Sequence, residues 1–235
     1  MNAQPENNSL HLALQQGELE LKGQFMLGSN YTFLVNVHHK GEELQAVYKP
    51  SKGEQPLWDF PDSTLAHREV AAYLISEALG WNFVPYTALR EDGPYGPGSI
   101  QQFIEYDPNY HYFNFSDEDK ARLGPVMLFD LLCNNADRKG SHVIFEEETD
   151  KMWLIDHGLC FHEEDKLRTV IWDYAGQPVP PDLLADLQAF KAHLDQGNGL
   201  QSTLNQLLNP DEMQMLEHRL DQLLESCRFP QPGPG

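Results

Sequence analysis

Two carboxylates that lie close together in the sequence have the spacing for chemistry on a phosphate group. Asp137 lies in the polar segment 134–142, and Asp156 directly follows the apolar pair Leu154-Ile155. We expect the first in a loop and the second at the end of a strand. Phosphoryl transfer needs one residue that orients the acceptor hydroxyl and one that holds the cations which neutralise the phosphate oxygens. Asp137 is the candidate for the first role and Asp156 for the second.

The spacing adds His142 as a second candidate metal ligand. It follows Asp137 by five positions (142 − 137), as the second metal-ligating residue follows the catalytic aspartate in the protein-kinase loop. Fourteen positions (156 − 142) then separate it from Asp156. That length leaves room for a hairpin with an acidic turn at residues 146–151, which we interpret as a solvated turn and not as a site.

Candidates for nucleotide contacts lie upstream, in the order that a kinase site requires. Lys49 ends a β-rich run, where a kinase carries the lysine that contacts the α- and β-phosphates. Glu69 follows twenty positions later (69 − 49) on a predicted helix and is a candidate partner for this lysine. Backbone N–H groups of the turn Gly28-Ser29-Asn30 could cap phosphate oxygens, although the same residues also make an ordinary hairpin turn.

Two points about the nucleotide site depend on how the elements pack. The same predicted helix carries Glu77, so the partner of the lysine depends on which helix face meets the sheet. A predicted strand over 100–105 leads to the connection between the two halves of the molecule. Exposed backbone groups at this connection, from Phe103, Ile104 and Glu105, are candidates for hydrogen bonds to adenine.

The two motifs resemble those of the phosphatidylinositol 3-/4-kinase-like superfamily, and most closely its small bacterial members. Residues 137–142 are similar to Asp-Arg-His-x-x-Asn, and residues 155–158 are similar to Ile-Asp-Phe-Gly or Ile-Asp-Asn-Gly. The resemblance runs from roughly residue 17 to residue 175. It implies an α+β, two-lobed protein-kinase-like fold with an antiparallel β-rich N-lobe, a mainly helical C-lobe and ATP between the lobes.

The resemblance also implies a role for each matching residue. The metal ligand is Asp156, and the phosphate-contacting lysine is Lys49 with Glu69 as its partner. The catalytic pair is Asp137, which accepts or orients the hydroxyl proton, and Arg138, which supports the loop.

This chain departs from the superfamily pattern at two positions. His142 stands where the superfamily has asparagine, and Lys139 stands where it has histidine. Imidazole is a softer ligand than an amide oxygen, so we expect Mn²⁺ to serve at least as well as Mg²⁺. With an ordinary imidazole pKa, His142 would lose metal affinity by protonation below about pH 6.

Composition limits the partners and the compartment that we expect. A net charge of −20 opposes binding to nucleic acid and to anionic lipid surfaces, and so disfavours a lipid acceptor and stable membrane association. Three cysteines (Cys133, Cys160 and Cys227) without CxxC spacing favour a reducing cytosol over a disulfide framework or a zinc site. Neither a signal peptide nor an apolar run of about 18 residues is visible. We therefore expect a cytoplasmic protein.

Periodicity predicts the elements that must position these residues. Period-two alternation between residues 18 and 50 predicts three antiparallel strands. A helix is expected from residues 62–64 to Gly80, which suits the position after a helix end. Ser116 with Asp119 resembles a capping box that opens one helix leading to the Asp137 loop. Two further helices are predicted, one after Pro180-Pro181 that stops before Gly197 and one with Pro210 near its first turn.

The predicted domain organisation follows from these elements. Residues 1–16 form a flexible lead or one short helix, 17–105 the N-lobe, 106–229 the C-lobe with the two loops, and 230–235 a disordered tail. The predicted function is an ATP-dependent kinase that transfers the γ-phosphate to a hydroxyl of a protein or small molecule with Mg²⁺ or Mn²⁺. Two alternatives stay open, a catalytically inactive nucleotide-binding pseudokinase and an AMP transferase on the same fold.

Overall fold

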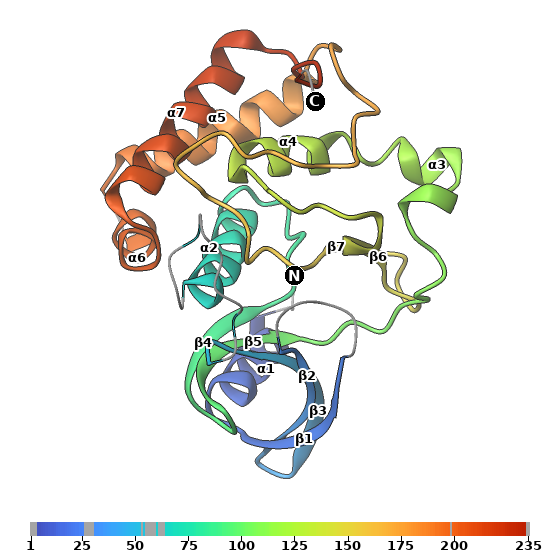
Figure 1. Cartoon of the computed structure of the whole chain (residues 1–235), viewed down its shortest axis with the longest axis vertical. Coiled ribbons are helices and arrows are strands. Elements are labelled where there is room, and N and C mark those ends of the chain that lie inside the picture. The colour runs from blue at the N-terminus through green and yellow to red at the C-terminus, as the bar shows by residue number, and fades with distance from the viewer. Residues whose placement is uncertain are drawn as a thin grey trace.

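An antiparallel sheet forms one end of the molecule and a group of helices forms the other (Figure 1). The computed structural model describes residues 4–25, 31–52, 54, 60, 64–197 and 199–233. The five strands of the sheet are arranged in the order β1-β2-β3-β5-β4, and all neighbours are antiparallel. They are β1 (Glu18–Gln24), β2 (Phe33–His39), β3 (Glu42–Pro50), β4 (Thr87–Gly93) and β5 (Gly96–Gln102). The three strands predicted between residues 18 and 50 are confirmed as β1, β2 and β3.

Alternation of apolar side chains gives this sheet one buried face. Val35 and Val37 of β2 and Ala46 and Tyr48 of β3 are fully buried, because successive side chains of a strand point to opposite faces. Helix α1 (Gln4–Gln16) contacts β2, β4 and β5 and buries its Leu14. The flexible lead expected for residues 1–16 is therefore wrong over 4–16, where the short-helix alternative holds.

Helix α2 (Leu65–Ala78) packs against β4 and β5 and carries Glu69. Its expected start falls at residues 62–64, of which 62 and 63 lie outside the described residues; Thr64 precedes the helix without a capping bond from its side chain. Gly80 takes a φ of +72°, the left-handed conformation that favours glycine after a helix end. The predicted stop is thus close to the observed one.

The second half of the chain is mainly helical and surrounds α4. Its elements are η1 (Tyr112–Asn114), α3 (Asp117–Lys120), α4 (Gly124–Cys133), η2 (Gly140–His142), β6 (Val143–Phe145), β7 (Met152–Leu154), α5 (Pro181–Asp195), α6 (Gly199–Leu207) and α7 (Pro210–Ser226). Strands β6 and β7 form the expected hairpin around the acidic turn. Helix α4 is buried along most of its length and contacts α7.

Two helix predictions for this half are wrong. The single helix expected from Ser116 is two helices, because Pro125 in the first turn of α4 has no N–H and cannot continue a preceding helix. Ser116 does cap the first of them, since its Oγ accepts a hydrogen bond from Asp119 N at 3.1 Å. After the expected α5, the tail contains both α6 and the predicted α7, so the α6 helix was missed.

The segment between the sheet and the helical half, and the described segment after α7, contain no helix or strand. Residues 103–111 contain neither helix nor strand, and the division into lobes at residue 105 remains a prediction. Residues 230–233 are also irregular, and residues 234–235 of the predicted tail lie outside the described part. Among the described helices, none is long and apolar enough to span a membrane.

Candidate active site

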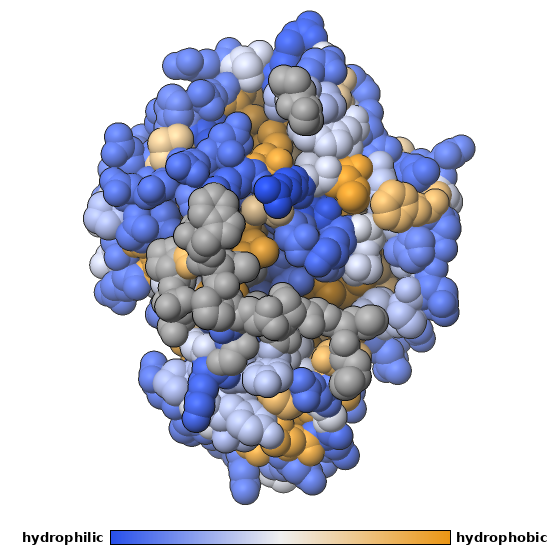
Figure 2. Space-filling view, in the orientation of Figure 1, coloured by the Kyte–Doolittle hydropathy of each residue, from blue (hydrophilic) through white to orange (hydrophobic). Residues whose placement is uncertain are grey.

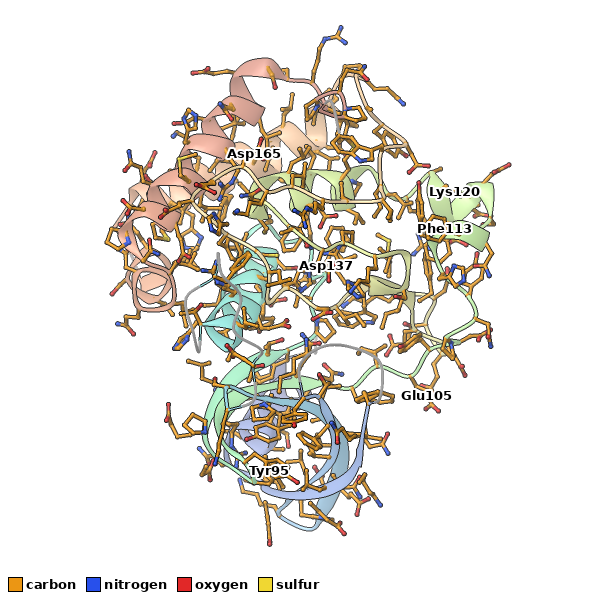
Figure 3. All side chains as sticks on the ribbon, viewed as in Figure 1. Tyr95, Glu105, Phe113, Lys120, Asp137 and Asp165 are labelled. Atoms are coloured by element: carbon orange, nitrogen blue, oxygen red, sulfur yellow. The ribbon has the colours of Figure 1, made fainter. Side chains whose placement is uncertain are left out.

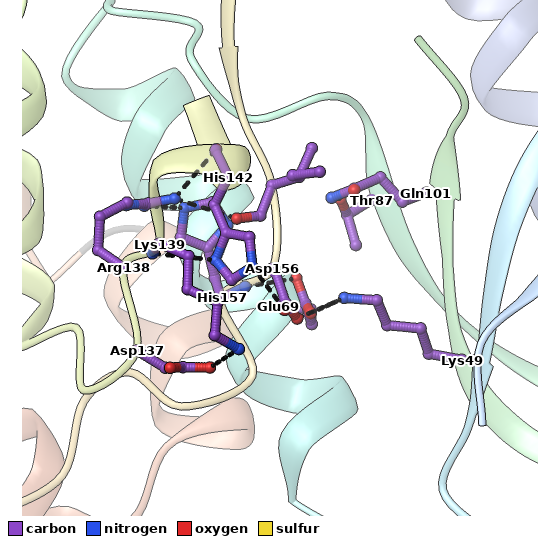
Figure 4. A network of polar contacts seen from close by, with 11 residues as sticks. Lys49, Glu69, Thr87, Gln101, Asp137, Arg138, Lys139, His142, Asp156 and His157 are labelled. Carbon is purple, nitrogen blue, oxygen red and sulfur yellow. Dashed lines mark hydrogen bonds and ion pairs between the residues drawn. The ribbon is translucent and has the colours of Figure 1, made fainter. Parts of the chain in front are cut away.

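A cavity of about 120 Å³ lies between the sheet and the loops that carry the predicted catalytic residues. Asp137 and Asp156, 19 positions apart in the sequence (156 − 137), both line it. The other charged lining residues are Lys49, Glu54, Glu69 and Lys139. One cavity therefore collects side chains from β3, α2, the Asp137 loop (residues 134–142) and the segment after β7 (Figure 4).

Lys49 is bonded to two carboxylates at once. β3 places its Nζ so that it donates to Glu69 Oε1 and, at 3.0 Å, to Asp156 Oδ1. Burial alone would lower the pKa of Lys49, but the charges of Asp156 and Glu69 outweigh burial and hold this pKa well above its ordinary value. The lysine therefore stays cationic at any physiological pH.

The structure decides which glutamate of α2 faces the lysine. Glu69 is 2% exposed, and its Oε2 accepts a hydrogen bond from His157 N at 3.1 Å. Glu77 is exposed. A helix rises by about 1.5 Å per residue, so these two side chains, eight positions apart, leave α2 about 12 Å from each other along its axis. Glu69 thus joins Lys49 to the backbone of the segment that carries Asp156.

Asp156 follows β7 in a left-handed backbone conformation with a φ of +64°. Aspartate is one of the few residues that tolerate this conformation. Its Oδ1 faces Lys49 and its Oδ2 lies 3.4 Å from His142 Nε2. The ammonium of Lys49 is the main reason that the pKa of Asp156 lies well below its ordinary value, so the carboxylate is ionised.

His142 is buried beside Asp156, at the end of η2. Burial is the main cause that lowers the pKa of His142 to about 4, with Asp156 opposing the shift and Arg138 and Lys139 adding to it. The expectation that this imidazole protonates below about pH 6 is therefore wrong. The ring is neutral across the physiological range, and neutral imidazole is the form that binds metal ions.

The donor set fits a divalent cation that is shared with another ligand. Asp156 and His142 offer one carboxylate and one imidazole, and no group of three histidine, cysteine or acidic residues in the described part of the chain could hold a metal by itself. Cations in nucleotide sites usually bind one or two protein ligands together with phosphate oxygens and water. The two side chains meet that pattern and do not form a cage.

Asp137 is partly exposed where it lines the cavity. Its side chain is 38% exposed and its Oδ2 forms an ion pair with Lys139 Nζ at 2.7 Å. Asn135 Oδ1 accepts a hydrogen bond from Asp137 N at 3.0 Å and so fixes the loop backbone. The carboxylate of Asp137 is thus partly open to solvent, and the cation beside it, Lys139, is one of the two residues that depart from the superfamily pattern.

Arg138 supports the loop and does not line the cavity. Its Nε donates to Asp130 Oδ1 at 3.0 Å, and its Nη1 donates to the carbonyls of His142 (3.2 Å) and Ile155 (3.1 Å). Its Nη2 is 2.9 Å from His157 Nε2. This buried guanidinium joins α4, the Asp137 loop and the Asp156 segment. Its predicted place in the catalytic pair is therefore limited to the supporting role.

Sequence reasoning missed Asp130, and it considered His157 as a metal ligand without adding it to the predicted site. Asp130 is fully buried in α4, and burial raises its pKa although Arg138 opposes this shift. A single acid inside the apolar run Val126-Met127-Leu128-Phe129 and Leu131 was the available signal. His157 is also fully buried, and burial, followed by Arg138, lowers its pKa well below the ordinary value.

The remaining predicted nucleotide contacts lie in two segments, the turn at residues 28–30 and the connection at residues 103–105. Gly28, Ser29 and Asn30 lie outside the described residues, while Tyr31 and Thr32, which follow them, line the cavity.

The predicted strand over 100–105 is too long, since β5 ends at Gln102, and the three residues that follow do not line the cavity. Phe103 N donates to Gln45 O at 3.3 Å, and Glu105 O accepts from Glu147 N at 3.1 Å. Ile104 between them is buried, and its main chain has no hydrogen-bond partner among the described residues.

The fold is that of the kinase-like class. The structure of the Golgi casein kinase with Mn and ADP bound superposes with a TM-score of 0.61 over 100% of this chain and 81% of that one, at 15% sequence identity. The Helicobacter pylori proinflammatory kinase CtkA superposes with a TM-score of 0.55 over 89% of this chain and 92% of its own, at 14% identity. The structure of hydra Fam20 superposes with a TM-score of 0.54 over 97% of this chain and 90% of its own, at 13% identity.

Within this class, the sequence identifies a particular family. The chain is 36% identical over 258 aligned positions to Protein Rv2133c of Mycobacterium tuberculosis, covering 95% of this chain and 91% of that protein. It belongs to the same family as Protein Rv2133c. No family model matches the chain.

Proposed function

We propose that the protein is an ATP-dependent kinase that transfers the γ-phosphate to a hydroxyl group with the help of a divalent cation. The observation that carries the proposal is the convergence of Lys49, Glu69, Asp137 and Asp156 on one cavity. A kinase requires the same four side-chain types in the same chain order, because positioning and charge neutralisation supply most of the catalysis. The kinase-like fold supports this reading of the site.

Each side chain has a role that follows from its contacts. Lys49, kept cationic by its two carboxylates, binds the α- and β-phosphates, and Glu69 holds its ammonium in place. Asp156 with His142 would hold the cation, which supplies neutralisation of phosphate charge when bound. Asp137, the cavity aspartate that Lys49 and His142 do not contact, accepts or orients the proton of the acceptor hydroxyl.

The finer features of the proposal rest on other observations. The Asp137-Arg138 and Asp156-x-Gly158 motifs favour the phosphatidylinositol 3-/4-kinase-like group within the kinase-like class. The main-chain groups of Ile104, which have no partner in the described chain, are the candidates for adenine. The net charge of −20 favours a protein or small-molecule acceptor over nucleic acid or lipid. A cytoplasmic location is part of the same proposal.

A transfer assay with labelled ATP tests the proposal. The purified protein is incubated with ATP labelled on the γ- or on the α-phosphate, with Mg²⁺ or Mn²⁺, and incorporation or release of label is followed. The kinase reading expects transfer from the γ-label only. Transfer of the α-label would instead identify an AMP transferase, and nucleotide binding without turnover would identify a pseudokinase.

Two isosteric variants separate the roles of the carboxylates. Asp137→Asn should lower turnover by at least about 100-fold while nucleotide affinity is kept, since it removes only the proton acceptor. Asp156→Asn should lower turnover and weaken binding of the metal–nucleotide complex. Calorimetric titration with a non-hydrolysable ATP analogue provides the affinities. Wild-type turnover in either variant would contradict its assigned role.

A further inference from the structure

A second and larger cavity, of about 1110 Å³, lies at the helical end of the molecule. Its walls are residues 165–168 of the segment after Asp156, one face of α7 and residues 228–233. The whole chain has 16 lysines and arginines against 36 acidic residues. This lining reverses that ratio, with two acids, Asp165 and Glu225, against four cations, which are Lys166, Arg168, Arg219 and Arg228. The cavity is therefore a local positive region on a strongly negative protein.

Three of these cations have no carboxylate partner within the described chain. Arg219 donates from Nε to Leu132 O at 3.1 Å and from Nη1 to His162 O at 3.3 Å, and its buried Nη2 has no acceptor. Arg228 donates to Gly176 O at 2.8 Å. Arg168 is exposed and forms no ion pair. Lys166, in contrast, pairs with Glu164 at 3.2 Å.

A guanidinium that is partly removed from water and forms no direct ion pair is costly, and an anion in the cavity would offset this cost. Burial lowers the pKa of Arg219, and the charges of Asp165 and Glu212, which form no ion pair with it among the described residues, oppose this shift only in part. Two carbonyl groups satisfy part of its hydrogen-bonding capacity but carry no net charge. Arginine is also the side chain best shaped for bidentate contacts with carboxylates.

The wall of this cavity is hydrogen-bonded to the Asp137 loop. Arg168 N donates to Asn135 O at 2.9 Å, and Arg168 O accepts from Arg138 N at 2.9 Å. Asn134 Nδ2 donates to the carbonyls of His162 (3.0 Å) and Glu164 (2.7 Å). Figure 3 shows Asp165 above Asp137, towards α7. A ligand in the cavity would therefore lie beside the residues that receive the acceptor hydroxyl.

We propose that this cavity binds an acidic segment of a protein acceptor, so that its hydroxyl side chain is presented to Asp137. The inference rests on the proposed kinase function and adds a substrate class to it. A concave site lined by Trp172 and Phe229 as well as by the arginines suits carboxylate side chains on a polypeptide. A flat bilayer does not enter such a site, and the overall charge repels extended phosphate backbones. Figure 2 shows a mainly hydrophilic surface over this end of the molecule, with smaller hydrophobic patches towards its middle.

Peptide binding without ATP tests this inference separately from catalysis. A fluorescein-labelled hexaglutamate peptide and a hexaglutamine control are titrated with the full-length protein at low ionic strength, and anisotropy is measured. We expect the glutamate peptide to bind more tightly, with an affinity that falls as salt is added. Arg168→Gln and Arg228→Gln should each weaken it by about tenfold, the usual effect of losing one charged hydrogen bond.

Lys22→Gln is the matched control, because it removes one exposed cation from β1, outside the cavity lining. Equal affinity for the two peptides, or equal affinity in the control and the two arginine variants, would overturn the inference. Binding to phosphatidylserine vesicles in place of the peptide would overturn it too, in favour of a membrane site. Because no ATP is present, a negative result in the γ-phosphate assay would reject the kinase and leave this measurement unchanged.

Discussion

At the scale of single residues, the site depends on how one cation and two carboxylates share a small space. Lys49 contacts both Glu69 and Asp156, and Glu69 is almost completely buried. Removal of the lysine leaves a buried carboxylate without its counter-charge. The free-energy cost of this unpaired charge is larger than the net stabilisation that the intact pair contributes. The energies of the two residues are therefore not additive.

A double-mutant cycle measures this coupling. Lys49→Met should lower the free energy of unfolding by about 3 kcal/mol, because it strands Glu69. Lys49→Met combined with Glu69→Gln should recover more than half of that loss, since no buried charge is then stranded at position 69 and Asp156, which also loses its cation, is partly exposed to water. Urea denaturation of the four proteins provides the values. Strictly additive effects would mean that the pair is not coupled.

His142 controls the choice of metal if it contacts the cation. His142→Asn replaces the nitrogen donor by an amide oxygen, which Mg²⁺ prefers. The wild type should turn over ATP with Mn²⁺ at least as fast as with Mg²⁺, and the variant should move the ratio of the two rates towards Mg²⁺ by several-fold. His38→Asn, on the sheet, serves as the control. An unchanged ratio in the His142 variant would remove it from the ligand set.

Sequence patterns located the charged side chains of the site but not the residues that hold them. Lys49, Asp137 and Asp156 were found because each lies next to a strand or a polar loop with a local signature. The bonds of Arg138 to Asp130 and His157 join segments far apart in the chain, and no local pattern encodes such a pairing. The preference for Glu69 over Glu77 was likewise decided by the packing of α2.

At the scale of elements, the contact between α2 and α7 matters most. Arg68, the neighbour of Glu69, is buried and donates to Cys160 O and to Glu212 Oε1 of α7. Glu212 also accepts from Asn209 N at 2.9 Å in the capping box of α7. One ion pair therefore fixes the helix that carries Glu69 relative to the C-terminal helix.

Neutralising this ion pair should weaken both the fold and the site. Glu212→Gln keeps the shape of the side chain but leaves the charge of Arg68 uncompensated. We expect a loss of about 2–4 kcal/mol in the free energy of unfolding and weaker binding of ATP analogue. Glu217→Gln, on the same helix and without a direct partner in the described chain, should change neither. Equal effects of the two variants would contradict a specific role for the pair.

The carboxyl group of Asp119, in the short helix α3, should stabilise the folded state by an amount that depends on pH. Burial opposes ionisation of Asp119, but hydrogen bonds from Tyr110, Ser116 and Arg122 outweigh it and lower the pKa of this carboxyl group. Because the folded-state pKa is below the unfolded value of about 3.9, the contribution is present above about pH 4 and is lost as pH falls through the folded-state pKa.

Denaturation of the wild type and of Asp119→Asn as a function of pH tests this prediction. The stability difference between the two proteins should be constant above about pH 5 and should shrink below about pH 4. Asp117→Asn, in the same helix turn and exposed, is the control. A difference that grows on acidification would reverse the sign of the predicted linkage.

Helices and strands were predicted correctly where one local sequence pattern, such as period-two alternation or a proline in the first helical turn, was clear. The period-two strands β1, β2 and β3 and the proline-initiated α5 and α7 follow local rules. The break between α3 and α4 was missed because Ser116 at the start and the apolar run at the end suggested one continuous helix. Helix α6 was missed because the short connection after Gly197 resembled a loop. The larger cavity combines α7 with residues 165–168, a contact that only the folded chain makes.

At the scale of the whole molecule, the net charge of −20 opposes compaction. Repulsion among like charges destabilises the folded state and is screened by salt. The melting temperature should therefore rise by a few degrees when NaCl is increased from about 20 mM to about 300 mM, within the screening range. Differential scanning calorimetry in one buffer at constant pH measures it. A falling melting temperature would show that the ion pairs outweigh the general repulsion.

The connection between α2 and α7 has a consequence for inhibition. Glu69 and Arg68 are adjacent, one directed to the cavity that Asp137 and Asp156 line and the other to α7. A compound inserted between these helices would move Glu69 away from Lys49, and it would do so without competing with ATP for a binding site. Its selectivity would then derive from the C-terminal helix of this family, a surface that other ATP-using enzymes need not share.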